Sequence, residues 1–151
     1  MTNDIMTNII EVPENERMDV LPHIFGKKFL RGEALVYDFT RAYCPDYNGG
    51  EWSFYVCDDD ALFMACPELG DNVTLRHPVF GEMKTDFLTA GLLMTFKAVT
   101  TIINEEIQSG DAELLSQLFY NRLAMYEVLC QMVGGDLLKW VMDIGDSVRP
   151  Y

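Results

Sequence analysis

The spacing of the apolar residues changes from a period of two to a period of 3.6 near Gly81, and this change restricts the possible fold classes. Between residues 51 and 77 apolar side chains recur at alternate positions, which is typical of strands; between residues 85 and 132 they recur at helical spacing. Because strands and helices occupy separate stretches, we predict an α+β fold and not a parallel βαβ sheet. A chain of 151 residues has room for one core. We therefore predict a disordered tail, residues 1–8, and a single domain, residues 9–151.

The strand region predicts an antiparallel β-meander of at least three strands. The first strand, residues 51–57, follows turn-forming residues and leads into an acidic three-residue loop, residues 58–60. The second strand returns over residues 61–66, and a third is expected over residues 72–77. Both faces of the first hairpin are apolar, so we expect both to be covered.

About four helices are expected to pack with this sheet. They cover residues 27–44, 85–107 and 112–132, and a short last helix follows Gly134 and Gly135. Gly32 lies inside the first helix, where it costs about 1 kcal/mol relative to Ala, so we expect a close approach by a neighbouring element.

The boundaries and faces of these helices can also be predicted. Thr85 and Asp111 are the expected N-caps of the two long helices. Residues 9–26 contain Pro13 and Pro22 and are expected to be extended or irregular. The helix over residues 112–132 is expected to bury one apolar stripe: Leu115, Leu118, Phe119, Leu123, Tyr126 and Cys130.

Composition excludes several classes of function. The chain has 24 acidic and 11 basic residues and a net charge of -13, which disfavours direct binding of nucleic acid. The four cysteines have neither zinc-site nor disulfide-framework spacing and are expected to be reduced thiols. The first 26 residues lack the apolar stretch of a secretory signal. The most apolar segment, residues 87–103, is too short for a bilayer span and contains Lys97. We expect a cytoplasmic protein with no membrane association.

The acidic residues are concentrated in two segments, residues 1–26 and residues 51–83. The loop at residues 58–60 does not fit a calcium site, because a loop that starts at Asp58 places Phe63 where glycine is required. Such a loop is more often simply solvated. The alternative is an acidic surface for a partner protein, whose candidate residues are Asp58, Asp59, Asp60, Glu68 and Asp71.

The chain contains few residues arranged for catalysis. His23 and His77 lie on different predicted elements with no nucleophile or acid at motif spacing, and no phosphate-binding or nucleophile-elbow motif is present. Trp52, Phe54 and Tyr55 favour core packing over a base-stacking surface, because their segment is acidic. We expect no catalytic residue, no cofactor and no metal.

Several stretches of the chain resemble the ArdB/KlcA family of antirestriction proteins. The matching residues are Val12-Pro13-Glu14 with Arg17, Leu21-Pro22 with Phe25-Gly26, the run Arg31-Gly32-Glu33-Ala34-Leu35-Val36-Tyr37, Asp46-Tyr47-Asn48-Gly49-Gly50 with Trp52 and Phe54-Tyr55, Phe63-Met64-Ala65, Leu75-Arg76, Gly91, and Asn104-Glu105. The resemblance covers about residues 12–107. It departs at residues 58–60, at Cys66 and in the C-terminal third.

The resemblance implies a small cytoplasmic inhibitor, carried by plasmids and other mobile elements, that protects incoming DNA from type I restriction-modification enzymes. It implies no residue-level role for the motif positions, which are Arg31, Gly32, Glu33, Asp46, Tyr47, Asn48, Gly49, Gly50 and Trp52. Three hypotheses follow: binding to a restriction-enzyme subunit, which we prefer; partial mimicry of DNA in the enzyme's DNA channel; and an unrecognised enzyme with a carboxylate-based site. The subunit bound and the oligomeric state are not predicted.

Overall fold

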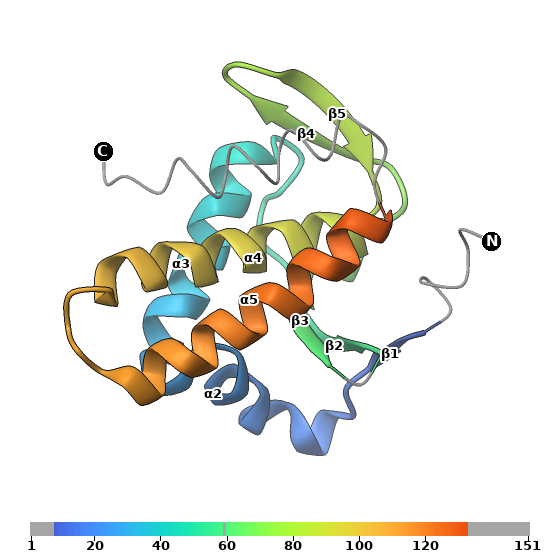
Figure 1. The fold of residues 1–151 in the computed structure, drawn as a ribbon. Coiled ribbons are helices and arrows are strands. Elements are labelled where there is room, and N and C mark those ends of the chain that lie inside the picture. The colour runs from blue at the N-terminus through green and yellow to red at the C-terminus, as the bar shows by residue number, and fades with distance from the viewer. Residues whose placement is uncertain (1–7, 59, 133–151) are drawn as a thin grey trace.

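All strand pairs are antiparallel and the two longest helices follow the last strand, which confirms the α+β class. The computed structural model describes residues 8–58 and 60–132 (Figure 1). Its elements in chain order are β1 (Ile9–Glu11), the 3₁₀ helix η1 (Glu14–Asp19), α2 (Val20–Phe25), η2 (Gly26–Lys28), α3 (Phe29–Tyr43), β2 (Ser53–Cys57), β3 (Ala61–Ala65), η3 (Pro67–Leu69), β4 (Val73–His77), β5 (Gly81–Thr85), α4 (Phe87–Glu106) and α5 (Ala112–Met132).

The strands form two antiparallel sheets. In the three-stranded sheet β2 is central, with Ile10 of β1 opposite Val56 and Phe63 of β3 opposite Tyr55. The predicted third strand, residues 72–77, is β4, but it pairs with β5 in a separate sheet. That part of the predicted meander was wrong. The 3₁₀ helix η3 and Gly70, with φ 76°, turn the chain away from β3 before β4 begins.

Residues 9–26 were expected to be extended or irregular; Ile9–Glu11 is extended, but the helical part of the segment contradicts the expectation. The segment contains β1, η1 and α2. Pro22 is the third residue of α2, where a backbone N–H has no partner inside a helix, so a proline is tolerated there. A proline therefore did not exclude a short helix.

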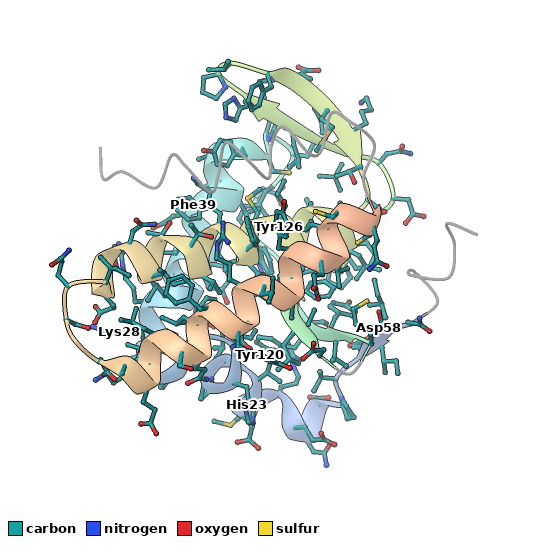
Figure 2. The ribbon with its side chains drawn as sticks, viewed as in Figure 1. His23, Lys28, Phe39, Asp58, Tyr120 and Tyr126 are labelled. Carbon is teal, nitrogen blue, oxygen red and sulfur yellow. The ribbon has the colours of Figure 1, made fainter. Side chains whose placement is uncertain are left out.

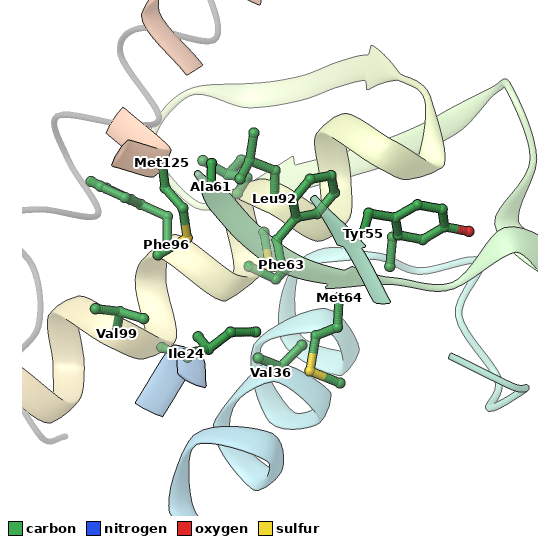
Figure 3. Close-up of a cluster of buried hydrophobic side chains, with 14 of the residues drawn as sticks. Ile24, Val36, Tyr55, Ala61, Phe63, Met64, Leu92, Phe96, Val99 and Met125 are labelled. Atoms are coloured by element: carbon green, nitrogen blue, oxygen red, sulfur yellow. The ribbon is translucent and has the colours of Figure 1, made fainter. Parts of the chain in front are cut away.

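Helix α4 is the centre of the core. Every residue from Thr89 to Thr100 is buried, and the helix packs against α3, α5 and β3. Figure 3 shows Leu92, Phe96 and Val99 of α4 in one cluster of buried side chains with Phe63 and Met64 of β3, and Met64 points toward Val36 of α3. The helix is long and apolar enough to cross a membrane, but 78% of its most apolar window is buried inside the protein. This degree of burial is typical of the core helix of a globular fold.

The two long helices begin at aspartates. The carboxylate of Asp86 accepts a hydrogen bond from the N–H of Thr89 at 2.7 Å, so Asp86, and not the predicted Thr85, is the N-cap of α4. The carboxylate of Asp111 accepts from the N–H of Leu114 at 3.1 Å, as predicted for α5. The predicted last helix lies outside the described residues.

The buried face of α5 differs from the predicted stripe. The helix buries Leu114, Leu118, Ala124, Met125, Val128 and Leu129. Of the predicted stripe only Leu118 is buried, whereas Phe119, Leu123 and Cys130 are exposed. The prediction failed because α5 carries apolar side chains on two neighbouring faces, and the face with the smaller side chains packs against α4 and β3.

Candidate functional site

Of the family-motif positions, Tyr47 contacts Trp52, which immediately precedes β2. The side chain of Trp52 is buried, and its indole N–H donates a hydrogen bond to the hydroxyl of Tyr47 at 3.1 Å. The ring centroids of Tyr37, on α3, and Tyr47 lie 5.4 and 5.8 Å from the indole. These three aromatic rings join α3, the loop after it and the three-stranded sheet.

Two charged residues are attached to this aromatic cluster. The Arg17 guanidinium donates a hydrogen bond to the backbone carbonyl of Trp52 and lies 5.7 Å from the centroid of the Phe54 ring. The carboxylate of Glu33 accepts a hydrogen bond from the Tyr37 hydroxyl at 3.0 Å. Burial, followed by this bond to Glu33, raises the pKa of Tyr37, so the hydroxyl stays protonated as the donor.

Two further motif positions fix α3 against its neighbours. Arg31 makes two hydrogen bonds to the carboxylate of Glu105 on α4, at 3.2 and 2.5 Å. A Cβ on Gly32 would lie only 2.3 Å from the ring of Phe25, which confirms the close approach predicted for this glycine. The motif residues of α3 therefore have structural contacts on both α2 and α4.

The loop over residues 46–50 is held by hydrogen bonds at its two ends. The N–H of Tyr47 donates to the carbonyl of Cys44 at 3.1 Å, and the N–H of Glu51 donates to the carboxylate of Glu68 at 3.1 Å. Gly49 and Gly50 have φ values of 98° and 129°, a region that favours glycine. The side chains of Asp46 and Asn48 are left exposed on this loop.

The predicted acidic surface is divided between the two ends of β3. Asp58 and Asp60 are exposed at the β2–β3 turn, and Asp59 lies outside the described residues. Glu68 and Asp71 follow the other end of β3, about 13–17 Å away for a strand of this length. The carboxylate of Glu68 also accepts the hydrogen bond from Glu51 at the end of the loop over residues 46–50. The structure thus brings Asp58 and Asp60 together but separates them from Glu68 and Asp71.

The acidic turn contacts α5 as well. The hydroxyl of Tyr120 donates a hydrogen bond to the carboxylate of Asp60 at 2.7 Å. Figure 2 shows Tyr120 on the side of α5 that faces the β2–β3 hairpin, with Asp58 at the hairpin's end. No sequence motif indicated this pair, because the two residues are 60 positions apart and belong to different elements.

The described residues offer little for catalysis. Within residues 8–58 and 60–132, no group of three or more His, Cys, Asp or Glu side chains is placed to hold a metal. His77 is buried, and its Nδ1 accepts the N–H groups of Val79 and Phe80, so it stabilises the turn before β5. A surface hollow of about 350 Å³ is lined by Glu16, Asp19, His23 and Asp60, whose side chains are all exposed. Exposed carboxylates of this kind do not favour the carboxylate-enzyme hypothesis.

Comparison with known proteins identifies the family. No family model matches the chain. An antirestriction protein KlcA of Escherichia coli is 32% identical over 113 residues, which are 72% of this chain and 78% of that protein. The chain belongs to the ArdB/KlcA antirestriction family. A putative antirestriction protein, YubI, of Escherichia coli strain K12 is 34% identical over 75% of this chain and 79% of that protein.

A solved structure extends the ArdB/KlcA relationship to the fold. It matches with a TM-score of 0.66 at 28% identity and covers 90% of this chain and 94% of that chain. Those KlcA and ArdB proteins are described as having a novel fold and antirestriction activity against type I DNA restriction systems in vivo but not in vitro. The match is longer than residues 12–107, so it includes part of the C-terminal third.

Proposed function

We propose that this protein acts in the cytoplasm, where it protects incoming DNA by binding a subunit of a type I restriction-modification enzyme, without catalysis or a cofactor. The observation that supports this most is the similarity to antirestriction protein KlcA over 78% of the length of that relative. The arrangement of the motif residues agrees with it. Trp52 binds Tyr47, and Arg31 binds Glu105 on α4. These contacts connect elements of the fold and do not form a substrate pocket.

Partial DNA mimicry is the weaker mechanism. Duplex DNA has about one charge per 1.7 Å of axis, so a net charge of -13 corresponds to only about 22 Å of duplex. Asp58 and Asp60 are also separated from Glu68 and Asp71 by the length of β3. We therefore favour a specific protein surface that engages the enzyme in the cell.

Plating of unmodified phage tests this function. Cells with an active type I system are compared with and without the gene, and a restriction-deficient strain gives the maximum plating efficiency. We expect the protein to raise plating on the restricting strain toward that maximum, with no change on the deficient strain. Unchanged plating, with folded protein shown to be present, would contradict the proposal.

A further inference from the structure

Helix α5 presents an apolar surface outside the core. We call Phe119, Tyr120 and Leu123 the outer face of α5; their side chains are 47%, 60% and 55% exposed. Tyr126 is half-buried and Cys130 is exposed, and together with Phe119 and Leu123 they repeat at helical spacing along one side of the helix. Single exposed apolar side chains are common, but a row of them marks an interaction site.

The outer face has an acidic border. Asp60 accepts the hydrogen bond of the Tyr120 hydroxyl at 2.7 Å, and exposed Asp58 lies on the same turn. The pKa of Tyr120 is raised chiefly by this bond to Asp60, with a smaller contribution from the charge of Glu127. Asp60 therefore lies at the tyrosine hydroxyl, and Glu127 is an exposed carboxylate about two turns further along α5. Arg122 is directed elsewhere, because its Nε–H donates to Thr100 on α4 at 2.9 Å.

This charge pattern distinguishes the possible occupants. A second copy of the chain would bring the same acidic border against itself, in a protein whose net charge is already -13. A partner protein whose surface presents apolar side chains beside lysine or arginine would bury Phe119 and Leu123. Its basic side chains would form ion pairs with Asp60 and Glu127. Apolar side chains at positions i, i+4 and i+7 of a helix are a recurring mode of protein recognition.

The geometry points to the outer face of α5, together with Asp60, as the surface that binds a restriction-enzyme subunit. The surface of that subunit presents an apolar patch flanked by basic side chains. This inference rests on the proposed function. It replaces the predicted partner surface, which was Asp58, Asp59, Asp60, Glu68 and Asp71, with the junction between Asp60 and α5. Tyr120 lies at the edge of the apolar row, three positions before Leu123, and its hydroxyl binds Asp60.

A matched pair of double variants tests the apolar part in the plating assay. Phe119→Gln with Leu123→Gln removes the phenyl and aliphatic side chains of the outer face and leaves Tyr120, and glutamine keeps a high helix propensity. The control, Leu30→Gln with Val79→Gln, changes side chains that are 70% and 77% exposed on other elements. We expect the first variant to lose at least tenfold in restriction relief and the control to retain it. Both should unfold within about 3 °C of the wild type, because all four side chains are exposed.

A second pair tests the charge. Asp60→Lys reverses the charge beside the outer face, whereas Asp71→Lys makes the same charge reversal beyond the other end of β3. We expect relief to fall with Asp60→Lys and to stay near the wild-type value with Asp71→Lys. Full relief by the Phe119→Gln, Leu123→Gln variant, at equal protein level, would overturn the inference. If the wild-type protein itself gives no relief, it is the proposed function that has failed.

Two physical measurements exclude the other occupants. A fall of more than about 10 °C in the unfolding temperature of the Phe119→Gln, Leu123→Gln variant would show that the protein's own chain covers this face, and would overturn the inference. A wild-type dimer that this variant converts to a monomer in analytical ultracentrifugation would show a contact between copies and overturn it as well. We expect the wild type and the variant to have the same mass in solution.

Discussion

Gly91 is a residue at which α4 packs closely on the backbone of β3. A Cβ at this position would lie 2.4 Å from both the backbone oxygen of Met64 and the Cβ of Ala65, distances that real Cβ atoms do not show. The backbone of β3 cannot move aside as a flexible side chain would. The absence of a side chain at Gly91 therefore sets the distance between the helix and the sheet.

Gly91→Ala should destabilise the protein by about 1–3 kcal/mol, because overpacking against backbone outweighs the gain of about 1 kcal/mol in helix propensity. Denaturant unfolding measures the change. Ser116→Ala, at an exposed position of α5, is the control and should have an effect close to zero. A Gly91→Ala variant as stable as the wild type would contradict the close contact between α4 and β3.

Cys57 links stability to alkaline pH. Its thiol is buried at the end of β2, and burial, with a smaller contribution from the charge of Asp58, raises its pKa from the ordinary 9.0 to about 11. Above pH 9 the unfolded chain releases this proton while the folded protein retains it, so stability decreases with rising pH. The decrease from this group is complete once the folded thiol also ionises, near pH 11.

Thermal unfolding between pH 8 and pH 11 checks this sign. We expect the unfolding temperature of the wild type to fall more steeply between pH 9 and 11 than that of Cys57→Ala. Ser116→Ala, at an exposed position without a titratable group, is the comparison. Its pH profile should follow the wild type. Equal slopes for Cys57→Ala and wild type would mean that the Cys57 thiol ionises as easily in the folded protein as in the unfolded chain.

At the scale of elements, the start of α4 depends on one side chain. The carboxylate of Asp86 accepts from the N–H of Thr89 at 2.7 Å and satisfies one of the free donors of the first turn. Asp86→Ala should cost about 1 kcal/mol, which corresponds to about 2–4 °C in the unfolding temperature of a chain of this size. Asp86→Ser keeps a capping oxygen and should recover most of the loss. Equal losses for Ala and Ser would argue against the cap.

The local signals in the sequence predicted these elements well, but not how they are combined. The β2–β3 hairpin, the end of α3 at Tyr43 and the Asp111 cap follow from turn residues, proline and capping chemistry within a few positions. By contrast, β5 has an alternating polar sequence with Met83 as its only large apolar residue, so its pairing with β4 had no apolar signal.

The two faces of α5 show the same limit. Apolar side chains at Phe119 and Leu123 have helical spacing, as do those at Leu118 and Met125, and periodicity cannot say which set meets α4. The site was similar: the resemblance included Tyr37 and Glu105 as well as Trp52, Glu33 and Arg31, but it did not say which of them pair. Those pairs form only in the folded chain.

At the scale of the whole molecule, the net charge of -13 has a direct consequence for partners. Binding to duplex DNA gains most of its free energy from basic side chains that replace counterions, and this chain has only 11 of them against 24 acidic residues. We expect no measurable binding to a 30-base-pair duplex at physiological salt in a fluorescence anisotropy titration. A tight, salt-sensitive complex with DNA alone would contradict both the subunit-binding and the mimicry mechanisms.

The central claim is that the protein acts by contact with a type I restriction enzyme, and affinity isolation from cells tests it most directly. Tagged protein is recovered after nuclease treatment from a strain with an active type I system and from a strain that lacks the system, and the subunits are identified by mass spectrometry. We expect at least one restriction subunit to co-purify from the first strain despite the nuclease, and to be depleted with the Phe119→Gln, Leu123→Gln variant. Full relief of restriction in the plating assay, with no subunit recovered even after chemical cross-linking in the cell, would contradict the account.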